Sequence, residues 1–340
     1  MKAWLAKLPN SVAKLPAALT FRRAREESDR AYHPFHAMVR KELSDHIHSW
    51  RTNILILLVG LTCISSIYAV LNGLDRNANI DEATKQFLFL KLFTATDGTI
   101  PPFITFVGFL GPLLGIGMGF DAIQSERSRG TLSRTLAQPV PRDYIINAKF
   151  VAALAIVGTL FVSMGFLVMG LGIIMTGIPP TPEQFVRMFL FLLASVVYVA
   201  FWLNLAILFS VRMRSAATSA LSGLGLWIFF VVFYPILVNV VVGALQPPSD
   251  YEQATWTQWF MRLSPSSLFE EATSTLLVPE IRTISGFLTM EQAVGAIPSP
   301  LPLGQSLLLV WPQLTALVAA TLVCFGLSYV GFMRQEIRAR

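Results

Sequence analysis

The chain has 340 residues, of which 54% are hydrophobic and 14% are charged, and its mean hydropathy is +0.59. Soluble domains carry about 25% charged residues, so this composition excludes an ordinary soluble protein and indicates a polytopic membrane protein. The net charge of +6 is explained by basic loops on one side of a membrane, so no nucleic-acid partner is predicted.

Six apolar blocks are long enough to cross a bilayer, which takes about 20 helical residues. Because backbone groups in lipid must form their hydrogen bonds internally, each block is expected to be an α-helix. The predicted fold class is an all-α integral membrane protein with one six-span domain over residues 52–333. Its predicted spans are residues 52–72, 101–120, 150–177, 187–211, 216–243 and 307–332.

The segment before the first span predicts a helix on the membrane surface. Residues 35–51 carry apolar side chains at helical spacing with charged residues between them, namely Phe35, Met38, Val39, Leu43, Ile47 and Trp50. Residues 1–34 form an N-terminal extension in which lysines and prolines interrupt every apolar stretch, so no cleavable signal is expected. That extension is either an interfacial anchor or disordered.

The distribution of Lys and Arg predicts the orientation in the membrane. With a cytoplasmic N-terminus, 20 of the 26 Lys and Arg residues fall on the inside, whereas acidic residues divide about evenly. Both termini, including the tail at 334–340, are therefore predicted to be cytoplasmic, in a multi-pass protein of the cell inner or plasma membrane.

Residues 121–149 form a charged segment between the second and third spans, on the predicted cytoplasmic side. Gly130 is expected to end one short helix, and Thr131 to cap the next. The second helix is expected to carry two leucines on one face and to stop at two prolines, namely Leu132, Leu136, Pro139 and Pro141. This pattern predicts either a docking element for a cytoplasmic protein or an ordinary loop.

The same segment resembles the signature region of ABC-2 type transporter permeases, in particular the type V exporter-like permeases whose ATPase is a separate chain. That pattern runs roughly D-x-x-x-x-E-R-x-x-G-T-L, then P-V-x-R, then a Lys. The matching residues are Asp121, Glu126, Arg127, Gly130, Thr131, Leu132, Pro139, Val140, Arg142 and Lys149. The rest of the chain is similar to this family too, with an elbow helix at 35–51 and a long external segment before the sixth span.

The resemblance implies that the segment contains a coupling helix, which in this family sits in a groove of a cytoplasmic ATP-binding subunit. It implies two such ATPase subunits, a second permease copy or paralogue, and export through the interface between the permeases. By analogy, polar contacts to the ATPase would be made by Glu126, Arg127 and Arg134. The turn would be set by Gly130 and Thr131. An apolar notch on the ATPase would be filled by Leu132 and Leu136.

ATP hydrolysis is not expected on this chain. No G-x-x-x-x-G-K-[ST] sequence occurs in it, so ATP and Mg²⁺ would be held by the partner ATPase and this chain would need no cofactor. Two cysteines within spans, Cys63 and Cys324, and four histidines before the first span predict no metal site. An intramembrane enzyme would need convergent catalytic groups within the spans, and the sequence offers none.

The predicted spans lack charged residues at their centres, which disfavours an ion-coupled carrier. Asn204 and Asn239 are the conspicuous polar residues there, and they either face a substrate path or bond neighbouring helices. Gly111, Gly115 and Gly119 recur every fourth residue, which allows close helix packing either within the chain or at a dimer interface.

Two external segments are predicted to contain short helices. In the 244–306 loop, Ser267 and Glu270 match a capping box. In the 72–100 loop, an apolar cluster from Phe87 to Phe93 predicts a helix pressed onto the membrane surface. The long 244–306 loop leaves an alternative function open, an ABC-type mechanotransmission or assembly subunit that acts on an extracytoplasmic partner without bulk transport.

Overall fold

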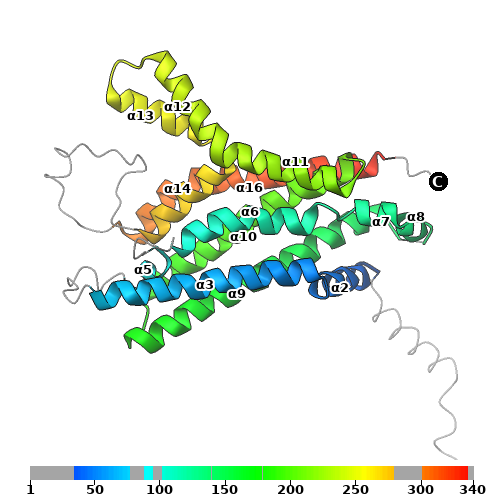
Figure 1. Ribbon diagram of the computed structural model, residues 1–340, viewed down its shortest axis with the longest axis horizontal. Coiled ribbons are helices and arrows are strands. Elements are labelled where there is room, and N and C mark those ends of the chain that lie inside the picture. The colour runs from blue at the N-terminus through cyan, green and yellow to red at the C-terminus, as the bar shows by residue number, and fades with distance from the viewer. Residues whose placement is uncertain are drawn as a thin grey trace, which may run out of the picture.

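The computed structural model describes residues 34–76, 88–94, 102–138, 140–177, 179–278 and 301–335, and all regular secondary structure in these ranges is helical. Figure 1 shows the long helices lying side by side as a bundle. The long helices are α3 (Trp50–Arg76), α6 (Phe103–Gly119), α9 (Arg142–Thr176), α10 (Pro182–Arg212) and α16 (Leu303–Met333). The shorter helices are α2 (Pro34–Ile47), α5 (Leu88–Thr94), α7 (Gln124–Ser128), α8 (Thr131–Leu136), α13 (Asp250–Met261) and α14 (Pro265–Leu277). A further long rod consists of α11 (Ala216–Ile228), the π-helical turn η1 (Phe229–Phe233) and α12 (Tyr234–Leu245).

Five helical stretches in the described ranges are long and apolar enough to cross a membrane. They coincide with the second to sixth predicted spans and comprise Phe103–Ser128, Arg142–Ile174, Pro182–Arg212, Ala216–Leu245 and Leu303–Met333. The predicted all-α, multi-pass membrane architecture is therefore confirmed. The predicted first span lies on α3, and a sixth crossing by this helix stays a prediction.

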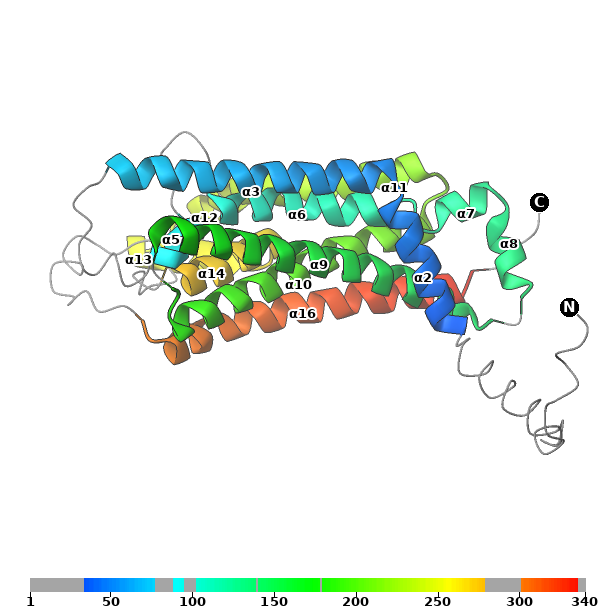
Figure 2. The ribbon, with the colours of Figure 1, turned by 90° about the horizontal axis from the view of Figure 1, so that it is seen from below.

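The bundle has two distinct ends (Figure 2). We call the end with α2, α7, α8 and the last turn of α16 the α8 end, and the end with α5, α13 and α14 the α14 end. At the α8 end the chain turns sharply between α2 and α3, at His48 and Ser49, so α2 lies oblique to the long helices. The predicted surface helix at 35–51 thus corresponds to α2 and the first residues of α3, whereas residues 1–33 of the predicted extension lie outside the described residues.

Helix α10 forms the centre of the bundle, since 78% of its apolar 18-residue stretch is buried. Of the glycines in α6, Gly111, Gly115 and Gly119 face this helix. A Cβ added at Gly115 would lie 2.8 Å from the backbone oxygen of Val199, and one at Gly119 would lie 2.8 Å from that of Leu203. The glycines therefore serve packing within the chain, which is one of the two alternatives that the sequence left open.

Helix α14 begins three residues earlier than the sequence predicted. Ser264 is its N-cap and accepts a hydrogen bond from the backbone N–H of Ser267, at 3.5 Å. The predicted capping box of Ser267 and Glu270 is therefore wrong. Ser264 combines a capping hydroxyl with a proline at the first helical position, Pro265, whose φ is already helical, and this combination determines where the helix starts.

Helix α5 lies in the core and not on a membrane surface. Phe89, Leu90 and Phe93 are all buried, and the ring of Phe93 packs edge-on against Phe103 and Phe191 with centroid distances of 5.7 Å. The prediction of a surface helix is wrong because an apolar cluster suits lipid and protein equally. The neighbouring α6 and α10 supply the aromatic partners that decide between them.

The α11–α12 rod is far less enclosed than α10, since only 11% of its corresponding apolar stretch is buried. Its middle is a π-helical turn, and Pro235, which lacks a backbone N–H, follows two residues later. Beyond this turn α12 and α13 lead away from the rest of the bundle (Figure 1). The hydroxyl of Tyr234 donates to the backbone oxygen of Phe260 at 2.6 Å and ties the two helices together.

Candidate functional site

The segment that leads from α6 to α9 folds into two short helices separated by a glycine. Gly130 has a φ of +68°, in the left-handed region that glycine adopts at little cost, and it is the N-cap of α8. Thr131 does not cap this helix, contrary to the prediction. It is already the first helical residue, and its hydroxyl donates to the backbone oxygen of Glu126 at 3.3 Å. This bond holds α8 against α7.

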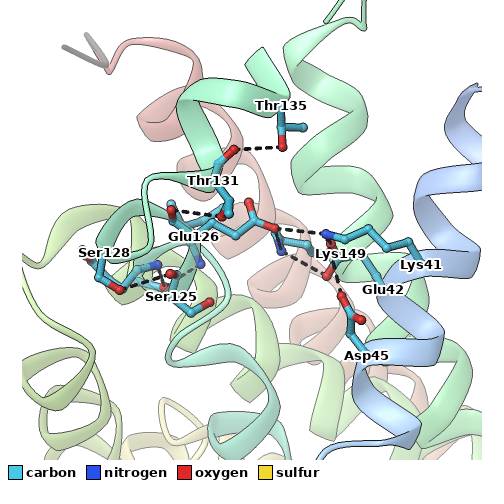
Figure 3. A network of polar contacts seen from close by, with 12 residues as sticks. Lys41, Glu42, Asp45, Ser125, Glu126, Ser128, Thr131, Thr135 and Lys149 are labelled. Carbon is cyan, nitrogen blue, oxygen red and sulfur yellow. Dashed lines mark hydrogen bonds and ion pairs between the residues drawn. The ribbon is translucent and has the colours of Figure 1, made fainter. Parts of the chain in front are cut away.

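Lys149, at the start of α9, is the centre of a buried ion-pair network (Figure 3). Its Nζ lies 3.0 Å from Glu42 Oε2 on α2 and 2.8 Å from Glu126 Oε1 on α7. The exposed fractions of the three side chains are only 6%, 10% and 14%. Lys149 therefore joins α2, the α7–α8 segment and α9 at a single atom.

Lys41 extends this network at the surface. Its Nζ lies 3.2 Å from Glu42, 3.6 Å from Glu126 and 3.7 Å from Asp45. Burial opposes ionisation of both Lys41 and Glu42, but the opposite charges around them outweigh it. The pKa of Lys41 is raised by Glu42 and Glu126, and the pKa of Glu42 is lowered by Lys149 and Lys41. Both groups are consequently ionised at neutral pH.

His46 lies on α2 next to these charges. Burial lowers its pKa below 6.5, and the positive charge of Lys149 acts in the same direction. The carboxylates of Glu42, Asp121 and Asp45 oppose this effect without reversing it. His46 is therefore neutral at neutral pH and gains a proton only under more acidic conditions.

The α7–α8 segment is also fixed to the end of α10. The Ser210 hydroxyl accepts hydrogen bonds from the backbone N–H groups of Ile123, at 3.0 Å, and Gln124, at 3.3 Å. The side-chain amide of Gln124 donates to the backbone oxygen of Met213. Ser210 and Gln124 are both buried, so this attachment lies inside the protein.

Gln335, just after α16, makes a third attachment. Its side-chain oxygen accepts from Arg127 at 3.3 Å, its backbone oxygen accepts from Arg142 at 3.5 Å, and its side-chain nitrogen donates to Val211. Four elements thus meet around one side chain at the α8 end: α7, α9, α10 and the end of α16.

A cavity of about 630 Å³ lies beside the network, between α2 and the α7–α8 segment, and extends inward along α6 and α10. Its lining is largely polar and includes Lys41, Glu42, Asp45, Asp121, Glu126 and Lys149. The charged side chains of the network thus border open space. Within the described residues, no group of three or more His, Cys, Asp or Glu side chains is arranged to hold a metal ion.

Comparison with known proteins assigns the chain to a family. Residues 36–337 match the family model described as ABC-2 family transporter protein. The chain belongs to this family. It is 24% identical over 301 residues to the "Probable ABC transporter permease protein NosY" of Stutzerimonas stutzeri, which covers 88% of this chain and 97% of that protein. A protein of the same name from Pseudomonas aeruginosa is 26% identical over 250 residues, covering 72% and 83%. The resemblance read from residues 121–149 is confirmed.

In this ABC-2 family protein, the residues predicted to contact an ATPase divide into an outward and an inward group. Arg127, Arg134 and Arg142 are exposed, as is Arg129, which the prediction omitted. Glu126 and Lys149 instead point toward each other and toward Glu42 (Figure 3). Their geometry gives them a role inside the chain. Asp121 lines the cavity, and Pro139 lies outside the described residues.

Leu132 also differs from its predicted role. Only 1% of this side chain is exposed, and it belongs to the hydrophobic core of the chain, against which the half-buried Leu136 packs. The prediction that Leu132 fills a notch on a partner is therefore wrong for this structure. The leucine face of α8 attaches the helix to its own bundle and leaves the arginine face outward.

The two asparagines within spans do not share a site in this chain. Asn204 on α10 is 1% exposed, its backbone oxygen accepts from Ser328 at 3.2 Å, and its side-chain amide has no hydrogen-bond partner among the described residues. Asn239 lies on α12 and is exposed. If both residues line a substrate path, a second copy of the protein would have to supply the rest of its lining. The role of the two asparagines stays a prediction.

Sequence reasoning missed Glu42, Ser210 and Gln335. Lys149 follows Glu126 by 23 residues and Glu42 by 107, so no local spacing links the three. Ser210 is one of many hydroxyls in apolar helices, where bonding to the helix's own backbone is the ordinary arrangement. For Glu42 a usable signal existed. Its spacing from Phe35, Met38 and Val39 places it on the apolar face of the predicted helix, where a carboxylate needs a partner.

Proposed function

We propose that this ABC-2 family protein is the transmembrane permease subunit of an ATP-driven exporter, and that α8 is the coupling helix that receives the motion of a separate ATPase. The observation that carries this proposal is the two-sided construction of the α7–α8 segment. Its inner side is tied to α2, α9 and α10 through Lys149 and Ser210, whereas its outer side presents arginines. A partner that displaces such a segment must displace the helices attached to it.

The exposed charges indicate the chemistry of that partner. Arginines at 127, 129, 134 and 142 project from α7, from the turn after it, from α8 and from the start of α9. An acidic groove on the ATPase would be complementary to this surface and would steer the encounter. In this proposal α2 is the elbow helix, and Lys149 holds it to the coupling helix so that both move together.

The asymmetry of Lys and Arg supports a cytoplasmic α8 end, with both termini on that side of the inner or plasma membrane. Two ATPase subunits would hold ATP and Mg²⁺, consistent with the absence of a phosphate-binding loop from this sequence. A second permease copy or paralogue would complete the translocation path. The weakly enclosed α11–α12 rod offers apolar surface both to that copy and to lipid.

Charge reversal on the outer surface tests the proposal. Arg129→Glu combined with Arg134→Glu should weaken association with the ATPase by about tenfold or more, because like charges would face each other across the interface. The measurement is co-purification of the ATPase with the full-length permease, together with ATP turnover of the complex in lipid nanodiscs.

Asp250→Lys is the matched control, since it reverses an exposed charge at the α14 end. The control should leave association unchanged. Unaltered association and turnover of the double arginine variant would reject the assignment of α8 as the coupling helix.

One observation favours the alternative of mechanotransmission to an extracytoplasmic partner. Helix α13 has no fully buried residue, and it exposes Tyr251 and Trp259 at the α14 end, with exposed fractions of 77% and 65%. Leu263, two residues after the helix, is 70% exposed. Replacing Asp250–Met261 with a Gly/Ser linker separates the two functions, since α14 stays in place. Retained ATP turnover and transport would favour the exporter, whereas loss of an extracytoplasmic partner with retained turnover would favour mechanotransmission.

A further inference from the structure

Arg187, near the start of α10, is completely buried at the α14 end of the bundle. All five of its N–H groups donate hydrogen bonds. Nε and Nη2 donate to Glu183 Oε1 at 3.0 and 2.8 Å, and Nη2 also donates to the backbone oxygen of Leu301 at 2.6 Å. Nη1 donates to the backbone oxygen of Leu276 at 3.1 Å and to the Ser306 hydroxyl at 3.0 Å.

These acceptors come from three separate parts of the chain. Glu183 is one turn away on α10, and Leu276 lies in the last turn of α14. Leu301 lies two residues before α16, and Ser306 lies in its first turn. The planar guanidinium presents its donors in a fixed fork, so it holds these acceptors in one relative arrangement. A lysine, with three donors at one atom, could not reach all of them together.

Leu276 and Leu301 flank the connection between α14 and α16. They stand at the two ends of the segment that joins α14 to α16, and Arg187 holds both ends to the same point on α10. Any displacement of the start of α10 is therefore delivered to both ends of that segment at once.

The other end of α10 carries the coupling segment. There, Ser210 accepts from Ile123 and Gln124. Between Arg187 and Ser210 the helix contains neither glycine nor proline, whereas α6 and α16 each contain an internal proline. At about 1.5 Å per residue, α10 is an uninterrupted rod of roughly 45 Å, with Arg187 near one end and Ser210 near the other.

We propose that Arg187 is a positioning residue that fixes the end of α14 and the residues leading into α16 to α10, so that α10 carries displacement of the coupling segment to the external side. This inference rests on the proposed function. Arg187 would have no part in ATPase association, which belongs to the opposite end of the molecule. It would determine whether ATP-driven motion reaches the external segment.

The test uses the full-length permease with its ATPase in nanodiscs and a fluorophore on Val278→Cys, in a background with Cys63 and Cys324 replaced by alanine. Fluorescence is compared between the nucleotide-free complex and the complex trapped with ATP and vanadate. The wild-type Arg187 background should show a shift on trapping. Arg187→Gln should reduce that shift by about fivefold or more, while ATPase association and turnover stay within about twofold.

Two further variants make the result specific. Arg262→Gln is the matched control, because Arg262 binds Glu271, at 2.7 Å, and joins α13 to α14. It should keep the shift. Ser210→Ala, at the opposite end of α10, should lose it in the same way as Arg187→Gln. If Arg187→Gln does not reach the membrane, Ser306→Ala decides, since it removes one acceptor and leaves the charge paired. A reduced shift in that variant supports the proposal.

An Arg187→Gln or Ser306→Ala complex with the full wild-type shift would overturn the inference, as would an equal loss in Arg262→Gln. A wild-type complex that turns over ATP without any shift at Val278 would overturn it as well. None of these outcomes touches the proposed function, which fails instead if the wild-type permease does not associate with an ATPase.

Discussion

Lys149 and Arg187 are buried basic residues at opposite ends of the same bundle, and their surroundings differ in kind. Lys149 lies between two carboxylates, with a third and a second lysine nearby and a polar cavity of about 630 Å³ alongside. Arg187 has one carboxylate, half of it in solvent, and three neutral oxygens as acceptors. One end is an ion network with room around it, and the other is a filled set of directed hydrogen bonds.

The difference suits two mechanical tasks. An ammonium group is a point charge with three rotatable donors, so it can keep both carboxylates paired through small changes in their position. A guanidinium with every donor used tolerates one arrangement only, because any shift leaves a buried polar group without a partner. In our proposal, α2 and the coupling segment move together at the α8 end, and Arg187 passes the displacement of α10 on at the α14 end.

The largest expected effect comes from removing the charge at the first of these ends. Lys149→Met leaves Glu42 and Glu126 buried without their main counter-ion and should destabilise the protein by about 3 kcal/mol. The value falls at the low end for a buried pair because Lys41 remains 3.2 Å from Glu42. Thermal unfolding in detergent measures it. Adding Glu42→Gln and Glu126→Gln should restore part of the loss, and an unchanged unfolding temperature of Lys149→Met would contradict the network.

Exchanging the two basic side chain types sharpens the comparison. Arg187→Lys should cost about 2 kcal/mol, since at least two buried acceptors lose their donors. Lys149→Arg should cost less than about 1.5 kcal/mol, because the adjoining cavity accommodates the larger group. The same unfolding assay compares them. Equal costs at both sites would mean that the fork geometry at Arg187 is not what matters.

A third prediction concerns the contact that keeps α10 in place between the two ends. Gly115→Ala would place a Cβ 2.8 Å from the backbone oxygen of Val199, which cannot move aside as a side chain can, and should cost about 1–3 kcal/mol. Gly158→Ala is the control, since nothing lies within 4 Å of its added Cβ. If both alanine variants unfold alike, the close approach of α6 to α10 is not limiting.

The smallest effect expected is a response to pH at the α8 end alone. The lowered pKa of His46 means that stability is lost as pH falls below about 6.5, where the unfolded chain takes up the proton more readily. The lowered pKa of Glu42 adds a loss as pH falls further, below 4.5, whereas the raised pKa of Lys41 withdraws its contribution only above 10.5. The hydrogen-exchange protection of α2, corrected for the intrinsic pH dependence of amide exchange, should therefore fall between pH 7 and 5. An equal fall in α14 would show that the response is not local.

Much of the fold followed from local patterns, because length and hydropathy define a membrane span almost without tertiary context. The second to sixth spans and the α2 helix are examples, and Gly130 sits at the predicted break between α7 and α8. The direction in which the functional side chains point did not follow from local patterns. Whether Glu126 faces a partner or Lys149 depends on contacts with residues far away in the chain, such as Glu42, more than 80 residues earlier. Leu132 faces inward because it packs into the hydrophobic core.

Each error has a physical cause of its own. The α14 start was misplaced because two serines three residues apart both fit a cap, and the proline after Ser264 decided between them. The α5 aromatics were assigned to lipid because burial in protein and burial in a bilayer favour the same residues. The attachments at Ser210, Gln335 and Arg187 involve backbone oxygens and hydroxyls, which every stretch of sequence contains, so only the three-dimensional arrangement reveals them.

The π-helical turn at Phe229–Phe233 has a consequence for how the protein tolerates changes in length. A single such turn accommodates one residue more than an α-turn, so the side chains beyond it are offset by about 100° from an unbroken helix. Shortening this turn by one residue would remove the offset and swing α13 around the axis of the rod, with few buried contacts to resist it. The same deletion inside α10 would rotate half of its enclosed surface away from α6 and α16. Relatives of this protein should therefore differ by insertions and deletions in the α11–α12 rod, but not in α10.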